Sequence, residues 1–270
     1  MSNHEYVHGY SEAESNRLSV QAMTLNEILY GDTIFKEGSL VLEAGCGVGA
    51  QTKEIAKNSF GAKIISVDIS KKSLSAARKK AADENNFSAE YLNCDIFSLP
   101  FLKNSFDYIF VCFVLEHLKN PDEALLELLK FLKPGGEIIV IEGDHGSAFF
   151  YPDSSDAKRN IECLVSLQAK AGGDALIGRR LYPLLKNAGF SDVCVFPRII
   201  YADSSNLSLV KGFTKNTFTA MVEGVGCDAV SSEIITAEEW EKGIRALNRT
   251  CEEDGTFCYT FFKATGIKKQ

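Results

Sequence analysis

The chain has 270 residues, of which 45% are hydrophobic and 24% charged, with a formal net charge of −7 at pH 7. These values are typical of a globular protein with a substantial core, in one large domain or one domain with appended segments. Proteins that bind nucleic acid usually carry basic clusters, and the only tight basic group here, over residues 71–80, has the spacing of one solvated helix face. The composition therefore argues against nucleic acid as a substrate.

Short apolar runs alternate with amphipathic stretches from about residue 39, the pattern of a parallel βαβ sheet. Ser70 is a good N-cap for a helix after the second run, and Asn120-Pro121 is a strong helix start after the fourth. A Pro-Gly-Gly turn at residues 134–136 leads into the fifth run. The predicted strands, in chain order, are 39–43, 63–68, 89–93, 106–112, 137–142, 193–201 and 256–265.

Three segments do not follow this rhythm. Residues 143–177 predict a long connection that is helical over 156–171, and residues 203–250 predict helices, including one over 237–249. We expect an N-terminal helical lid over 1–38 and an α/β domain over 39–270, with helical insertions at about 143–177 and 203–250. All three segments could cover one end of the sheet.

The loop after the first predicted strand, residues 43–50, is rich in glycine. Glycines let the backbone turn sharply and approach a ligand near the start of the next helix. The spacing Gly45-x-Gly47-x-x-Ala50 also fits the dinucleotide fingerprint, and a tight turn without a ligand would have the same composition. Glu43 would repel a pyrophosphate, whereas it would attract the ammonium and sulfonium groups of S-adenosylmethionine (SAM). The charge pattern favours SAM.

The order Glu43-x-Gly45-x-Gly47-x-Gly49 resembles motif I of the class I SAM-dependent methyltransferases. Further motifs of that family follow in order, at residues 68–69, 93–96, 105–107 and 132–136. The resemblance implies an α/β fold with a seven-stranded, mostly parallel, doubly wound sheet whose last strand is antiparallel, together with helical cap elements.

The resemblance also implies roles for single residues. Asp68 would hold the ribose hydroxyls, and Asp95 would accept a hydrogen bond from the adenine amino group. Ile69 and Ile96 would pack against adenine. At the methionine end of SAM, the lining residues would be Cys112 and Phe113.

The N-terminal stretch around Tyr6 and Arg17 resembles a subset of these enzymes in which an aromatic residue and a helix close over the cofactor. Arg17 is a candidate partner for the SAM carboxylate, although an ordinary surface helix would show the same charges. The complete set of expected cofactor-binding residues is Tyr6, Arg17, Glu43, Ala44, Gly45, Cys46, Gly47, Asp68, Ile69, Asp95, Ile96, Cys112 and Phe113.

The segment after the fourth strand lacks the Asn/Asp-Pro-Pro-Tyr-type motif of methyltransferases that act on nucleobases or glutamine amides. It resembles the small-molecule branch of the family. His145, just after the fifth strand, is the first candidate catalytic residue and His117 the second; either could have only a structural role. No metal site is expected, because no Cys/His cluster has zinc spacing.

The resulting hypothesis is methyl transfer from SAM to a small molecule, with release of S-adenosylhomocysteine. The alternatives are an NAD(P)-dependent oxidoreductase and a SAM-binding regulator without catalysis; methylation of a protein also stays open.

Eight scattered cysteines without a C-x-x-C pair indicate a reducing compartment. The first 17 residues lack an apolar signal core, and the longest apolar run, residues 108–115, is far too short to span a membrane. We therefore expect a cytoplasmic protein.

Overall fold

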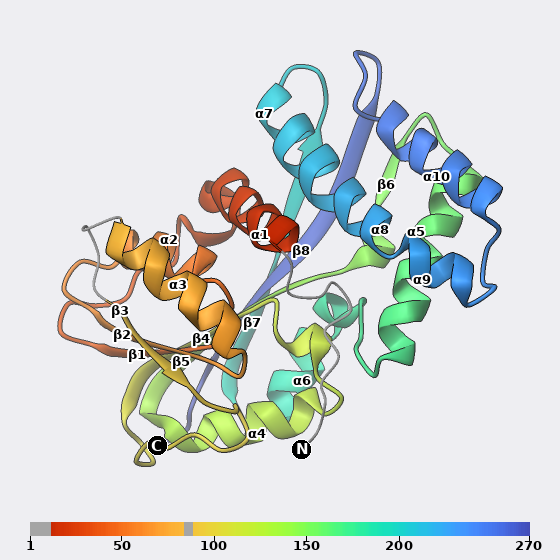
Figure 1. Cartoon of the computed structure of the whole chain (residues 1–270). Coiled ribbons are helices and arrows are strands. Elements are labelled where there is room, and N and C mark those ends of the chain that lie inside the picture. Colours follow the sequence, from red (N-terminus) through yellow and green to blue (C-terminus); the bar gives the residue numbers. More distant parts are fainter. Residues whose placement is uncertain (1–11, 84–88) are drawn as a thin grey trace. The chain divides into compact units, whose positions relative to one another are not determined.

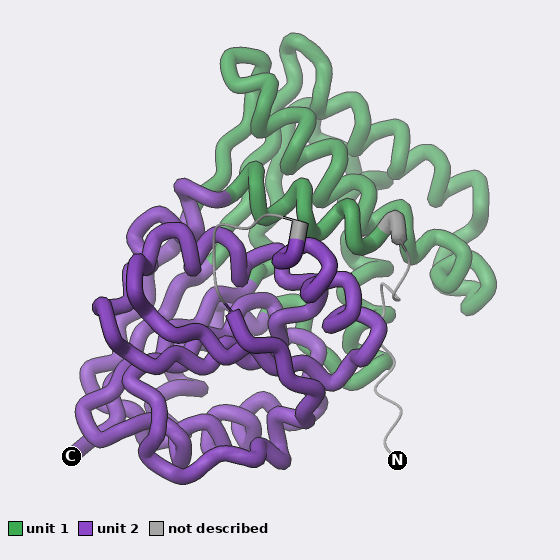
Figure 2. The backbone as a smooth tube through the Cα atoms, turned by 60° about the vertical axis from the view of Figure 1, so that its left-hand side comes forward, with its two compact units in different colours: residues 1–25, 143–176, 199–261 green, residues 26–142, 177–198, 262–270 purple. Residues whose placement is uncertain are grey.

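The computed structural model describes residues 12–83 and 89–270. The chain divides into two compact units (Figure 2). Unit 1 consists of Met1–Leu25, Gly143–Leu176 and Ile199–Phe261, and unit 2 of Asn26–Glu142, Ile177–Arg198 and Phe262–Gln270. The expected division into a lid over 1–38 and a domain over 39–270 stays a prediction.

Five parallel strands lie side by side in the order β3-β2-β1-β4-β5 (Figure 1). Their middle members are nearly continuous apolar runs, as expected for strands that are covered on both faces. The bounds are β1 Leu40–Ala44, β2 Lys63–Asp68, β3 Ala89–Asn93, β4 Phe106–Cys112 and β5 Leu132–Gly143. In parallel strands all carboxyl ends meet at one edge, where ligands bind in open α/β sheets.

Two long strands complete the sheet: β8 (Thr256–Ile267) follows β5, and β7 (Ser191–Ala202) pairs with β8. Near the start of β5, Gly135 N donates to Lys268 O at 2.9 Å, and Lys268 N donates to Gly136 O at 3.0 Å. The end of β8 thus meets the start of β5, so the two strands are antiparallel. The predicted mostly parallel sheet of the class I type, with an antiparallel last strand, is confirmed.

Two features of the sheet differ from the sequence expectation. The fifth strand begins at Leu132 rather than 137, because the Pro-Gly-Gly segment pairs with the residue after β8 instead of forming a separate turn. A short strand, β6 (Phe149–Tyr151), pairs with the beginning of β8. Three residues are too few to show the alternation by which strands are recognised in a sequence.

Helices cover both faces of the unit 2 sheet. In Figure 1, α2 (Ala50–Asn58) and α3 (Lys71–Asp83) lie on one side, and α4 (Pro121–Phe131) and α6 (Leu181–Asn187) on the other. The α4 and α6 side supplies most of the large apolar core, including the buried residues Leu125, Leu128 and Leu184. Three short helical segments complete this unit: η1 Asn26–Tyr30, η2 Leu115–His117 and η4 Ile177–Arg180.

Unit 1 is mainly helical. Three of its segments follow one another without a break, and the middle one, η5, is a π-helix. Gly212 in η5 allows a close approach to α1, because a Cβ there would lie 2.2 Å from Thr24 Oγ1. The helical segments are α1 Glu12–Thr24, η3 His145–Ser147, α5 Ser155–Lys170, α7 Leu207–Leu209, η5 Val210–Thr219, α8 Ala220–Gly224, α9 Gly226–Ser231 and α10 Ala237–Arg249.

The helices predicted over 156–171 and 237–249 are confirmed as α5 and α10. Within the part of the chain that the structure describes, no helix has the length and apolar character needed to cross a membrane.

Candidate functional site

The glycine-rich loop between β1 and α2 has a left-handed backbone, with φ of 81° at Gly45, 53° at Gly47 and 72° at Gly49. Residues other than glycine rarely adopt this backbone conformation. A Cβ on Gly45 would lie 2.4 Å from Val114 Cγ2, so this glycine lets the turn after β4 pack closely. A Cβ on Gly47 would meet no atom within 4 Å. The loop is therefore tight on the Gly45 side and open at Gly47.

The backbone N–H groups of this loop bond within the chain itself. Gly45 N and Cys46 N both donate to Val67 O, at 2.8 and 3.0 Å. Gly47 N donates to Asp68 Oδ2 at 2.8 Å. In a dinucleotide site, such N–H groups face the pyrophosphate. Here these three are already satisfied, and one of them by a carboxylate.

Glu43 lies behind the loop near the end of β1, with only 3% of its surface exposed. Its Oε2 accepts hydrogen bonds from Thr52 Oγ1 and Ser66 Oγ, both at 2.6 Å. Burial raises the pKa of Glu43 to about 7, although these two hydroxyls favour the ionised form. Glu43 thus ties β1 to β2 and α2 and holds the loop from behind.

Asp68, at the end of β2, contacts the loop and the start of the next helix. Its Oδ1 accepts from Ser70 N at 2.7 Å, and burial raises the pKa of its carboxyl group, while the N–H groups of Ser70 and Gly47 favour the ionised form. Asn93 Nδ2 donates to the carbonyls of Asp68 and Ile69, both at 2.9 Å. Ile69 is 50% exposed, so an apolar side chain stands in solvent beside Asp68.

The loop after β3 lies next to the loop after β2, because these strands are parallel neighbours. Cys94 N donates to Asp68 O at 3.1 Å. Asp95 Oδ1 accepts from Phe97 N at 3.0 Å, which fixes a turn, and Ile96 packs partly against the core. The structure therefore brings the two loops of the expected adenosine end together.

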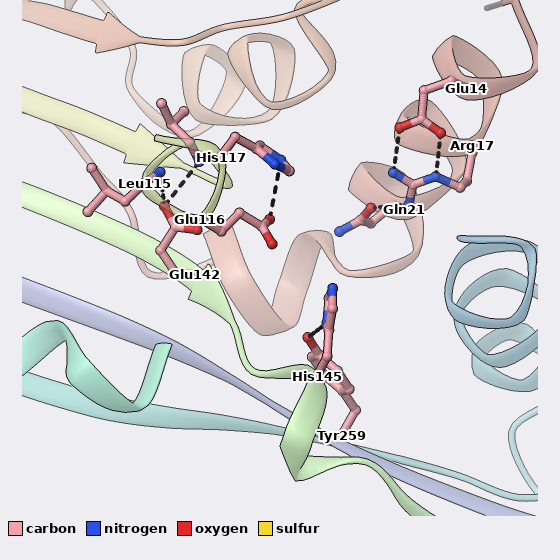
Figure 3. A network of polar contacts seen from close by, with 10 residues as sticks. Glu14, Arg17, Gln21, Leu115, Glu116, His117, Glu142, His145 and Tyr259 are labelled. Atoms are coloured by element: carbon pink, nitrogen blue, oxygen red, sulfur yellow. Dashed lines mark hydrogen bonds and ion pairs between the residues drawn. The ribbon is translucent and has the colours of Figure 1, made fainter. Parts of the chain in front are cut away.

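The residues expected to line the methionine end of SAM lie at the end of β4 and in the turn after it. Cys112 is buried, with Sγ 3.6 Å from Tyr30 Oη. Phe113 has a φ of 56°, and its N–H donates to Ile141 O at 2.9 Å. His117 lies on η2, with Nε2 3.6 Å from Glu116 Oε1 (Figure 3).

Residues 42–140 match the family described as "Methyltransferase domain". This segment runs from β1 through β5 and includes every unit 2 loop described above. This chain contains a class I SAM-dependent methyltransferase domain.

In the part of the chain that the structure describes, no group of three or more His, Cys, Asp or Glu side chains could hold a metal ion.

The methyltransferase domain has relatives in several organisms. An uncharacterized 37.1 kDa protein in transposon TN4556 of Streptomyces fradiae is 30% identical over 192 residues, which cover 70% of this chain and 54% of that protein. A demethylmenaquinone methyltransferase of Tropheryma whipplei is 36% identical over 115 residues, which cover 43% of this chain and 46% of the relative. The chain thus spans about half the length of these curated relatives.

Among solved structures, phosphoethanolamine N-methyltransferase 2 of Haemonchus contortus, in complex with S-adenosyl-L-methionine, matches with a TM-score of 0.56. The match covers 93% of this chain and 52% of that one at 20% identity, so it shows the shared fold. Homologous methyltransferases bind SAM.

Two of the expected cofactor-binding residues of the methyltransferase domain have side chains in the core. Ala44 is fully buried in the large apolar cluster, and Cys46 packs with Leu74 and Ala77 of α3. Because both side chains are buried among apolar residues, we expect any contact of these two residues with a ligand to be made by their backbone atoms.

Three other expected site residues do not belong to the loops described above. Tyr6 is outside the described residues. Arg17 of α1 forms an ion pair with Glu14 at 2.7 Å (Figure 3). His145 is 5% exposed, and its Nδ1 lies 2.7 Å from Tyr259 Oη. Arg17 and His145 both belong to unit 1, where these contacts are made.

The sequence analysis missed the two hydroxyls that hold Glu43. Ser66 stands directly opposite Glu43 in the β1–β2 register. A polar residue in the middle of an apolar strand, two positions before Asp68, is the signal that could have identified it. Glu142 could be interpreted from the sequence as an acceptor-site residue or a solvated loop charge, but its contact with the turn after β4 was not predicted.

Proposed function

We propose that this protein transfers the methyl group of SAM to a small-molecule acceptor and releases S-adenosylhomocysteine. The observation that carries the proposal is the bonding of the glycine loop. The N–H groups of Gly45 and Cys46 donate to Val67 O, and the N–H of Gly47 donates to the carboxyl group of Asp68. A loop whose N–H groups are already bonded, one of them to a carboxylate, disfavours a pyrophosphate and suits a cationic cofactor without phosphate.

SAM would supply the electrophilic methyl group, and the protein would hold it and align the acceptor. Such a displacement needs a nucleophile held in line, and a general base only if the nucleophile must lose a proton. In the proposal, Asp68 and Asp95 bind the adenosine end, and the backbone around Gly45, with Cys112 and Phe113, receives the methionine end.

The remaining roles in the proposal concern the acceptor and the cofactor carboxylate. His145 is the first candidate proton acceptor and His117 the second. Tyr6 and Arg17 are proposed to contribute to cofactor binding from the N-terminal segment. Replacement of each histidine by alanine, once an acceptor is known, tests the two histidine roles separately.

A small-molecule acceptor is supported by the names of two of the relatives. One is a demethylmenaquinone methyltransferase and the other a phosphoethanolamine N-methyltransferase. The acidic net charge and the missing Asn/Asp-Pro-Pro-Tyr-type motif argue against a nucleobase.

Calorimetric titration with SAM, S-adenosylhomocysteine and NADH tests the cofactor. We expect wild type to bind both adenosyl ligands and not NADH. Asp68→Ala should lose this binding, whereas the matched control Asp228→Ala, at an exposed position in α9, should keep it. Binding of NADH alone, or of none of the three ligands, would refute the proposal. A positive result leads to an acceptor screen by mass spectrometry.

A further inference from the structure

The turn after β4 is held in an unusual backbone conformation. Phe113 is left-handed, with a φ of 56°, which a residue with a side chain adopts only at an energetic cost. Such strain persists where neighbouring contacts enforce it, and it is frequent at ligand sites. The contacts that enforce it at Phe113 come from the end of β5.

Three successive N–H groups of this turn bond to the last residues of β5. Phe113 N donates to Ile141 O at 2.9 Å. Val114 N and Leu115 N then both donate to Glu142 Oε1, at 3.0 and 2.7 Å. Figure 3 shows the carboxyl group of Glu142 directed at the N–H groups of this turn. One side-chain oxygen therefore fixes the two residues that follow the strained one.

The same turn packs against the glycine loop. The Val114 side chain lies where a Cβ on Gly45 would stand, so a shift of Val114 would change the surroundings of the loop. Glu142 is therefore linked to the glycine loop through Val114. The backbone N–H of Val114 donates to Glu142, and the side chain of Val114 packs against Gly45.

Glu142 accepts these two hydrogen bonds in surroundings that disfavour its negative charge. It is fully buried, and burial, followed by the neighbouring carboxylate of Glu116, raises the pKa of Glu142 well above its usual range. Among the described residues, Oε2 has no hydrogen-bond partner. A neutral side chain of the same length could make both contacts to the turn.

We propose that Glu142 is a positioning residue that shapes the turn after β4 for the amino-acid end of the cofactor. This inference rests on the proposed function. Binding of the adenosine end should not depend on Glu142. In the proposed function the adenosine end lies at the loops after β2 and β3, and Glu142 forms none of the hydrogen bonds described above with those loops.

The test compares S-adenosylhomocysteine with adenosine, which lacks the amino-acid end, by calorimetric titration of the full chain. The variants are Glu142→Gln, which keeps the length, and Glu142→Asp, which keeps the acid but is one methylene shorter. Glu142→Met removes the acceptor, and Glu90→Met, at an exposed position in β3, is the control.

We expect Glu142→Gln to bind both ligands like wild type. Glu142→Asp and Glu142→Met should bind S-adenosylhomocysteine about tenfold more weakly, since the buried N–H of Leu115 and the part-buried N–H of Val114 lose their acceptor, with adenosine affinity unchanged. Equal losses for both ligands, no loss, or a loss in Glu142→Gln as large as in Glu142→Asp would overturn the inference. If Glu142→Met does not fold, the Gln and Asp pair still decides. Failure of wild type to bind S-adenosylhomocysteine would instead refute the proposed function.

Discussion

Glu43 should make the stability of this protein depend on pH in a predictable direction. Its pKa in the folded chain is about 7, against an ordinary value of 4.5. Because the folded-state pKa is the higher one, the neutral form is favoured on folding. The stabilisation is complete below about pH 4.5 and is lost as the pH rises through about 7.

The magnitude follows from the two pKa values. The difference between about 7 and 4.5, at about 1.4 kcal/mol per pH unit, gives a total of ~3 kcal/mol. Linkage places about 1 kcal/mol of this loss between about pH 6 and pH 8. Glu43→Gln removes the titration and keeps an oxygen that can accept from Ser66 and Thr52.

Urea denaturation of wild type and Glu43→Gln at about pH 6 and pH 8 measures the effect. We expect the unfolding free energy of wild type to fall by about 1 kcal/mol more than that of the variant. Asp68 and Glu142, whose pKa values are also raised, contribute to both proteins and cancel in the comparison. Glu90→Gln, at an exposed position, should behave like wild type. Equal pH dependence of wild type and Glu43→Gln would refute the reasoning.

Three further predictions concern single contacts. Gly45→Ala should lower the unfolding free energy by about 3 kcal/mol, because the new Cβ meets Val114 and the left-handed backbone is strained. Gly47→Ala should lower it by only about 1 kcal/mol, from backbone strain alone. Thermal unfolding of the two variants measures this difference. Thr236→Ala should cost about 1 kcal/mol by removing the capping box of α10, measured in urea. Asn93→Ala should weaken adenosine binding several-fold without lowering stability, since it frees the two carbonyls after β2, and calorimetry tests this.

The parallel strands and the loops at their carboxyl ends were largely predictable because the information for them is local. Each parallel strand is a short apolar run, and most of the expected cofactor-binding residues lie at the end of one or directly after it. Parallel pairing then brings the ends together, as in the contacts of Asp68 with Gly47 and of Asn93 with the loop after β2. The order of motifs along the chain was enough to predict this edge.

The contacts that were missed join segments far apart in sequence. Glu142 reaches Leu115 over 27 positions, and His145 meets Tyr259 over 114. No periodicity or capping pattern encodes such pairs, because each partner belongs to an ordinary element of its own. The π-helical turn of η5 was not predicted either, because its residues also fit the pattern of an α-helix.

Recognition of the cofactor and recognition of the acceptor draw on different kinds of contact. Discrimination against phosphate depends on backbone N–H groups that already have acceptors, and these are properties of one loop and the strand beside it. Recognition of an acceptor depends on side chains from several segments. His145 of unit 1, which we propose to serve the acceptor, has its ring next to those of Phe218 of η5 and Tyr259 of β8. Changes in those segments would therefore alter the acceptor while leaving the glycine loop intact.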